Sequence, residues 1–316
     1  MTYVWNHLTP ENVPQWTELT NLLAEVDGTD EFYDAEDLAE ELTEHGFDPA
    51  FDSWAVFDGN TMVAYGQLRV GTNLDREGRL RANLDGGVHP EHRGRGIGRE
   101  LMDRMEARAT ELAAERFPEA EAYWRASGGL EGASVRDLLA HRGYEVVRYF
   151  NLLGRRLPGP APTQQQVEAT LVTPQPHHQE AVRLAHNAAF ADHWGSSPST
   201  PETWRDHWTA RSNRMDLSTL AIDPADPDRV LAYVLAGQWV PRELYVNLVG
   251  TIPDARGRGL AAAALARTIA LATEAGEYDV IELDVDSDSP TGATRLYDKL
   301  GFTLKKTLAT MQRDAR

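Results

Sequence analysis

The chain has 316 residues, is 41% hydrophobic and 25% charged, and contains no cysteine. This composition is ordinary for a globular protein with room for two cores, and the missing cysteines exclude disulfides and cysteine-based acyl-enzymes. The formal net charge of −18 disfavours nucleic-acid binding and steers small cations towards the protein, although solubility alone also accounts for it. No apolar run reaches membrane-spanning length and no signal-peptide pattern opens the chain, so we expect a cytoplasmic protein that binds no membrane.

Hydrophobic periodicity in the first half predicts an alternation of short strands and amphipathic helices. The expected strands are 2–8, 53–57, 62–70, 79–88, 120–126 and 144–153, and the expected helices are 10–26, 34–44, 96–116 and 133–142. Gly143 follows the last of these helices at the position where glycine commonly ends a helix.

The second half repeats this order after residues 157–166, a segment rich in Pro and Gln that we interpret as a linker. The expected strands are 169–172, 217–222, 229–239, 243–251, 278–284 and 302–311, and the expected helices are 177–190, 200–211, 259–274 and 291–300. Two copies of one element order predict two whole domains rather than a short repeat.

A glycine-rich turn joins a strand to a helix in each half. Arg93 and Arg256, which open the two turns, are 163 residues apart (256 minus 93). Such a turn points backbone N–H groups and the positive end of a helix dipole at one spot, which favours a phosphate or pyrophosphate. Gly257 and Gly259 let the backbone approach that ligand, and Arg256 and Arg258 are candidate charged donors.

The two turns resemble the acyl-CoA loop of the Gcn5-related N-acetyltransferase (GNAT) superfamily, Arg/Gln-x-x-Gly-x-Gly/Ala. They read Arg93-x-x-Gly96-x-Gly98 and Arg256-x-x-Gly259-x-Ala261, and the Leu296-Tyr297 pair ahead of Gly301-Phe302 is similar to a pair in the family's later helix. The resemblance also extends to the tandem acetyltransferases of actinobacteria.

The resemblance implies an α/β fold of the mixed α+β kind, with a twisted mixed sheet flanked by helices in each of two tandem domains, 1–156 and 167–316. It also implies splayed fourth and fifth strands, a bulge at Gly86-Gly87 or Gly250, and acetyl-CoA as acyl donor. The residues it assigns to acetyl-CoA are Val249, Thr251, Arg256, Gly257, Arg258, Gly259, Leu260 and Ala261, with Val88, Arg93, Gly94, Arg95, Gly96, Ile97 and Gly98 in the first half.

Acetyl transfer to an amine needs a base for the ammonium proton and benefits from an acid for the leaving thiolate. The resemblance points to Tyr297 as the acid, and Glu243 is the candidate base, with a solvated strand end as its alternative. Aligned glycines place Leu139 and Leu80 at these positions in the first half. We therefore expect a catalytic second domain and a catalytically degenerate first domain.

The amine is expected to contact the segment between the first two helices of the second half, where His193 and Trp194 are candidate contacts. Glu282 and Asp284 are further candidates, as substrate contacts or as alternative bases. A packed loop explains the segment equally well. His89 and His92 lack a third ligand at a suitable spacing, so we expect no metal site.

Three functions agree with these residues. The first is direct acetyl transfer to a small-molecule amine, such as an aminoglycoside or another cationic metabolite. The alternatives are a mycothiol-synthase-like transfer to an amino-thiol precursor and a non-catalytic, regulatory acyl-CoA-binding protein. We expect a monomer, because two fused domains can replace a homodimer, and a dimer stays open.

Overall fold

The computed structural model describes residues 2–162, 166–288 and 293–315 and divides into two compact units. Unit 1 comprises Met1–Tyr149 with Thr307–Arg316, and unit 2 comprises Phe150–Lys306. Residues 163–165 of the expected linker 157–166, and residues 291–292 of the expected last helix, lie outside the described residues.

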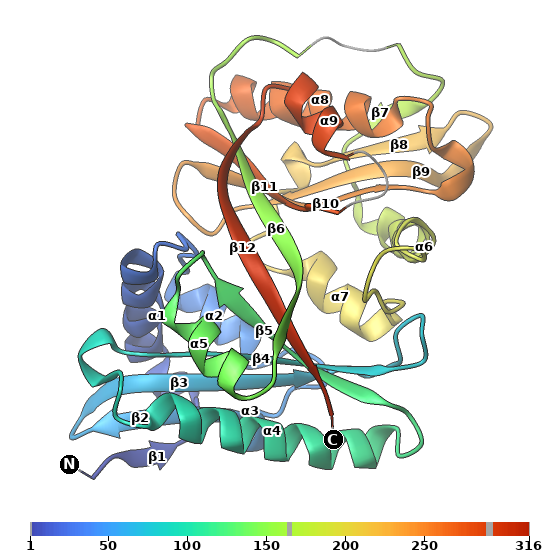
Figure 1. Ribbon diagram of the computed structural model, residues 1–316. Helices are drawn as coiled ribbons and strands as arrows, with labels where there is room; N and C mark the ends of the chain where they lie inside the picture. Colours follow the sequence, from blue (N-terminus) through green and yellow to red (C-terminus); the bar gives the residue numbers. More distant parts are fainter. Residues whose placement is uncertain (1, 163–165, 289–292, 316) are drawn as a thin grey trace. The chain divides into compact units, whose positions relative to one another are not determined.

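Unit 1 is a mixed sheet between two layers of helices. Its elements are β1 (Val4–Asn6), α1 (Val13–Asp27), α2 (Ala35–Glu41), α3 (Pro49–Asp52), β2 (Ser53–Asp58), β3 (Thr61–Val70), β4 (Leu80–Val88), α4 (Ile97–Arg116), β5 (Ala122–Gly129), α5 (Ser134–His141) and the start of β6 (Glu145–Arg156). The strand order is β1-β2-β3-β4-β5-β12, and β4 pairs with β5 in parallel. Figure 1 shows α4 (teal) on one side of β3 and α1 and α2 (blue) on the other.

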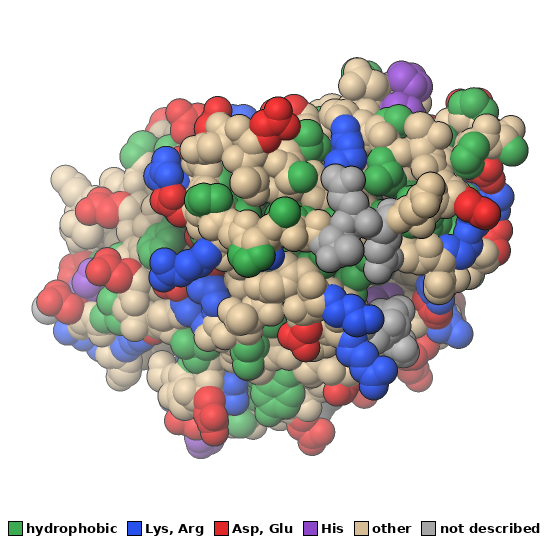
Figure 2. Space-filling model, turned by 90° about the horizontal axis from the view of Figure 1, so that it is seen from above, with side chains coloured by type: hydrophobic (Ala, Val, Ile, Leu, Met, Phe, Trp, Pro, Cys, Tyr) green, Lys and Arg blue, Asp and Glu red, His purple; other side chains and the backbone are tan. Residues whose placement is uncertain are grey.

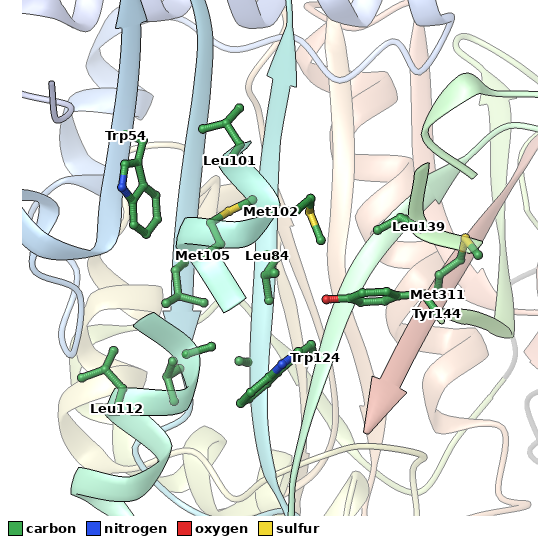
Figure 3. Close-up of a cluster of buried hydrophobic side chains, with 14 of the residues drawn as sticks. Trp54, Leu84, Leu101, Met102, Met105, Leu112, Trp124, Leu139, Tyr144 and Met311 are labelled. Atoms are coloured by element: carbon green, nitrogen blue, oxygen red, sulfur yellow. The ribbon is translucent and has the colours of Figure 1, made fainter. Parts of the chain in front are cut away.

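The core of unit 1 forms because α4 turns one apolar stripe towards the sheet. Leu101 and Met105 of α4 pack with Leu84 of β4 and Trp124 of β5 in one buried cluster (Figure 3). Alternation along β4 places Leu80, Ala82 and Leu84 in this core and turns the intervening residues to the α1 side. A separate cluster, which includes Trp16, forms under α1 and α2.

Unit 2 repeats this arrangement. Its elements are the end of β6, β7 (Thr170–Val172), α6 (Gln179–Ala189), α7 (Pro201–Thr209), β8 (Thr219–Asp223), β9 (Asp226–Gly237), β10 (Glu243–Thr251), α8 (Leu260–Ala275), β11 (Val280–Asp286), α9 (Ala293–Lys299) and the start of β12 (Thr303–Asp314). The strand order is β6-β11-β10-β9-β8-β7, and only β10 and β11 pair in parallel among these. Residues of α8 and α9 bury one face of the sheet, and those of α6 and α7 bury the other.

The last strand of each half completes the sheet of the other half. Strand β6 pairs antiparallel with β11 in unit 2, and β12 pairs antiparallel with β5 in unit 1. The compact units therefore exchange these strands relative to the division at 156 and 167 that the sequence suggests. That division stays a proposal about the domains.

Charged side chains of both signs are interspersed over the face that Figure 2 views. Within the described ranges 2–162, 166–288 and 293–315, every helix is too short or too polar to cross a bilayer.

Candidate functional site

Both glycine loops have the geometry expected for an anion site at a helix N-terminus. Gly257 and Gly259 adopt φ angles of 76°, and α8 begins at Leu260. Gly94 and Gly96 adopt φ angles of 74° and 89° ahead of α4 in unit 1. These left-handed angles favour glycine, and they turn the first N–H groups of each helix towards the same side.

The space over these loops is open. A Cβ built on Gly257, Gly94 or Gly96 would meet no atom within 4 Å. Leu260 and Ile97 anchor the two helices with buried side chains, so they offer the ligand only backbone groups. Open space over the first N–H groups of a helix, which have no carbonyl partner within the helix, fits the pyrophosphate of acetyl-CoA.

The fourth and fifth strands of each unit separate beside the glycine loop. In unit 2 the parallel register ends at Tyr245–Glu282, although β10 continues to Thr251. In unit 1 it ends at Leu84–Ala126, although β4 continues to Val88. The exposed backbone edges of such a gap can receive the extended arm of an acyl-CoA.

The bulge expected at Gly250 or Gly86-Gly87 lies elsewhere. The β10–β9 register shifts between Val246 and Leu248, whereas Gly250 pairs regularly with Tyr233. Strands β3 and β4 pair without a shift through Gly86 and Gly87. The fourth strand of unit 2 thus has an irregularity as expected, but the predicted position at the glycines was wrong. Glycine at residues 86, 87 and 250 instead makes room for neighbours packed close to the strand.

Gly250 makes room for the ring of Tyr233. A Cβ at residue 250 would lie 2.4 Å from Cε1 and Cζ of Tyr233. The Tyr233 hydroxyl is 2.7 Å from Nδ1 of His186 on α6, and burial lowers the pKa of His186 to about 4. A neutral imidazole thus supports the buried tyrosine beneath the segment Val249–Thr251, whose N–H groups are the candidate donors to a thioester carbonyl.

Tyr297 lies in α9 and is 6% exposed. Its ring packs edge-to-face on Phe302 at 6.0 Å, and Val249 packs against the same cluster. Burial raises the pKa of Tyr297 to about 12, so the phenol keeps its proton at neutral pH. Tyr297 is thus held protonated on the α8 side of β10.

The candidate bases occupy different positions. Glu243 is the first residue of β10, seven residues before Gly250, which is about 23 Å along a strand. Asp284 lies two residues beyond the last β10–β11 pair and accepts a hydrogen bond from Tyr245 Oη at 2.7 Å. Asp284 is exposed, yet the surrounding protein raises the pKa of its carboxyl group. Glu282 is buried and forms an ion pair with Lys305.

The segment between α6 and α7 contacts the glycine loop of unit 2. Arg256 donates to both carboxylate oxygens of Asp192, at 2.6 and 3.0 Å. His193 packs on Phe190 with ring centroids 5.3 Å apart, and Trp194 is half-buried. Arg258 is exposed and donates to the Glu168 carbonyl at 3.2 Å. The structure therefore brings the expected acceptor segment and the expected donor loop together through Arg256.

Unit 1 places Leu80 and Leu139 in its core, as their types suggest. The comparison of the two halves at these two positions did not identify Asp85 as a candidate site residue. Asp85 is the first residue of β4 beyond its pairing with β5. Asp85 keeps exposed surface, yet surrounding protein raises the pKa of its carboxyl group. The alternation of Leu80, Ala82 and Leu84 was the available signal, because it turns Asp85 to the α1 side.

Among the residues that the structure describes, no group of three His, Cys, Asp or Glu side chains is arranged to hold a metal ion.

The family model described as "Acetyltransferase (GNAT) family" matches residues 7–123 and 180–302. The chain is 32% identical to the mycothiol acetyltransferase of Salinispora arenicola over 228 residues, 68% of this chain and 67% of that protein. It is also 32% identical to the mycothiol acetyltransferase of Geodermatophilus obscurus over 232 residues, 68% of each chain.

Solved structures agree over the whole chain. A GCN5-related N-acetyltransferase from Sphaerobacter thermophilus is 25% identical, with a TM-score of 0.76 over 99% of this chain and 96% of that one. A tandem GNAT protein from the clavulanic acid biosynthesis pathway is 19% identical, with a TM-score of 0.69 over 100% and 99% of the two chains. The chain therefore belongs to the GNAT acetyltransferase family, in its tandem two-domain form.

Proposed function

We propose that this chain uses acetyl-CoA to acetylate the amine of a small cationic molecule, and that unit 2 is a catalytic unit. The observation that carries the proposal is the gap between β10 and β11, which has the open loop Arg256–Ala261 at its end. A protonated phenol, Tyr297, lies on the α8 side, and the carboxylate of Asp284 lies on the other face of the sheet. Acetyl-CoA supplies the activated acyl group as a thioester.

The groups of unit 2 can divide the proton transfers between them. Asp284 takes the proton that the substrate ammonium must lose before its nitrogen attacks. As the amide C–N bond forms and the thioester C–S bond breaks, Tyr297 gives its proton to the departing sulfur. The second proton that the nitrogen loses on becoming an amide then restores the Tyr297 phenol through solvent. Backbone N–H groups near Val249–Thr251 stabilise the oxyanion of the tetrahedral centre. We prefer Asp284 to Glu243 as the base because Glu243 lies far along β10 from Gly250.

The face of β11 on which we expect the amine to bind favours a cation. Glu282 and Asp284 alternate with Leu283 and Val285, which face the α8 core, so both carboxylates lie on the opposite face of β11. Lys305 neutralises Glu282, while Asp284 shares its face with Tyr245, whose hydroxyl donates to it. An alkylammonium would therefore be attracted to this face, and amino-sugar amines belong to that class.

The test of the function is release of free CoA thiol from acetyl-CoA across a panel of amines, with the full-length chain. The chain has no cysteine, so it adds no background to a thiol reagent. We expect turnover with cationic amines. Amino-sugar precursors of the kind suggested by the mycothiol acetyltransferases carry a thiol of their own, so their turnover is followed by the mass of the acetylated product instead. CoA binding without turnover on any amine would instead support the acyl-CoA-binding alternative.

The base assignment predicts a pH effect. Tyr245→Phe removes a hydrogen bond that stabilises the Asp284 carboxylate, so the pKa of Asp284 rises further. Because the base must be ionised, we expect the acid limb of kcat/KM to move to higher pH in Tyr245→Phe. Tyr278→Phe is the matched control, because Tyr278 donates to Gln238 at 3.2 Å instead. If the acid limb of kcat/KM stays at the same pH in Tyr245→Phe, and Glu243→Gln loses its activity, then Glu243 is the base and Asp284 is not.

One observation favours a second catalytic unit. Asp85 is the first residue of β4 beyond its pairing with β5, and it pairs with Gln67 of β3. The equivalent position in unit 2, two residues before Gly250, is Leu248, which pairs with Leu235. Unit 1 thus has a carboxylate two residues before Gly87, at a level where unit 2 is apolar. Calorimetry gives the number of CoA molecules bound per chain. A comparison of acetyl transfer by Asp85→Asn and by Asp284→Asn then shows whether one unit or both are active.

A further inference from the structure

The arginine that opens each glycine loop is bound to an aspartate near the end of the first long helix of its own unit. Asp27 is the last residue of α1, and Asp192 lies three residues after the end of α6. In unit 1, Arg93 Nη1 and Nη2 donate to Oδ1 and Oδ2 of Asp27 at 2.8 and 2.6 Å. In unit 2, Arg256 donates to both oxygens of Asp192 in the same bidentate manner. The partners are 66 and 64 residues apart in sequence. Each unit has therefore formed the same long-range pair with its own residues.

Further contacts fix the direction of each arginine. Arg256 Nη2 also donates at 2.9 Å to the carbonyl of Ala189, the last residue of α6. Arg93 Nε donates at 3.0 Å to the carbonyl of Val88, the last residue of β4. Arg256 thus makes three hydrogen bonds to protein acceptors, which is most of what its five N–H donors can make.

We propose that Arg256 and Arg93 are positioning residues and are not ligands of the CoA phosphates. Each fastens its glycine loop to the chain at the C-terminal end of the first long helix, through Asp27 in α1 and through Asp192 just after α6. In unit 2 the aspartate belongs to the stretch 190–197, which is expected to contact the amine. The pair Arg256–Asp192 then sets the distance between the donor loop and the acceptor segment. This inference rests on the proposed acetyl transfer, and it names the contact that holds the acetyl donor and the amine at a fixed distance from each other.

The chemistry of the pair suits this role. A planar guanidinium binds a carboxylate through two parallel bonds and so fixes orientation as well as distance, which an ammonium cannot do. The side chains are 32% exposed for Arg256 and 50% for Asp192. Pairs this exposed contribute little to folding, so their removal should disturb the site far more than the stability of the unit.

The experiment is a double-mutant cycle on the full-length chain with Arg256→Ala, Asp192→Ala and both together. Calorimetry gives the CoA dissociation constant, and acetyl transfer gives KM for the amine. We expect each single variant to raise the amine KM by about fivefold, the equivalent of a pair worth roughly 1 kcal/mol. The double variant should be no worse than either single variant, and CoA affinity should change by less than about twofold. Arg256→Lys should behave like Arg256→Ala.

A phosphate ligand would give the opposite pattern. Arg256→Ala would then weaken CoA binding by about tenfold or more, Asp192→Ala would leave it unchanged or tighten it, and the two effects would add. That result would overturn the proposal and leave the acetyltransferase function intact. Asp27→Ala and Arg93→Ala provide the matched pair in unit 1. An unsubstituted chain that binds no CoA would overturn the proposed function itself, and this inference with it.

Discussion

Tyr297→Phe is expected to lower kcat by about 100-fold while CoA binds with unchanged affinity, because the change removes one proton donor and keeps the ring. Tyr297 is buried against Phe302, and phenylalanine fills the same space there. The loss should appear equally in kcat and in kcat/KM, since the phenol acts on the sulfur only as the C–S bond breaks.

The pKa of about 12 sharpens this expectation. A phenol with such a pKa stays protonated across the working range, so Tyr297 should not produce an alkaline limb near neutral pH. Rate measurements at saturating amine, with calorimetry for CoA, check the prediction. Tyr278→Phe tests whether loss of any buried hydroxyl in unit 2 has the same effect. A kcat for Tyr297→Phe within about threefold of the unsubstituted enzyme would show that solvent protonates the thiolate.

Most of the element order was predictable because it depends on local patterns. Period-two and period-3.6 apolar spacing predicted the strands and long helices to within a few residues at their ends. The expected glycine loops lie ahead of α4 and α8, as predicted, and the structure adds that their glycines are left-handed. These features need only a few neighbouring residues, and sequence reasoning handles such features well.

What was not predictable depends on partners distant in the sequence. The exchange of β6 and β12 follows from strand pairing, which the two repeated halves leave ambiguous because each last strand has the same local pattern. The Arg256–Asp192 pair joins residues 64 positions apart, so the arginine alone suggested a phosphate donor. Asp85 was missed because an alignment on glycines compared Leu80 with Glu243 and passed over the position where β4 leaves β5.

Gly250→Ala is expected to destabilise unit 2 by about 1–3 kcal/mol, the usual cost of an extra methyl group in a filled core, and to abolish most of the activity. The added Cβ would lie 2.5 Å from Tyr233 Oη and closer still to its ring. Tyr233 is fully buried and its hydroxyl is bound to His186, so the ring cannot turn away. The backbone of β10 must move instead, and the N–H groups proposed to face the thioester move with it.

Gly257→Ala is the matched control, because that site has open space and only a left-handed φ of 76° to oppose a side chain. It should cost about 1 kcal/mol from backbone strain alone. A cycle of Gly250→Ala with Tyr233→Leu, followed by urea unfolding, separates contact from strain. Leucine removes the atoms nearest residue 250, so the two substitutions together should destabilise less than their sum, by about 1 kcal/mol or more. Strict additivity would mean that Gly250 is required by its backbone conformation, and that Tyr233 has no part in shaping the acyl site.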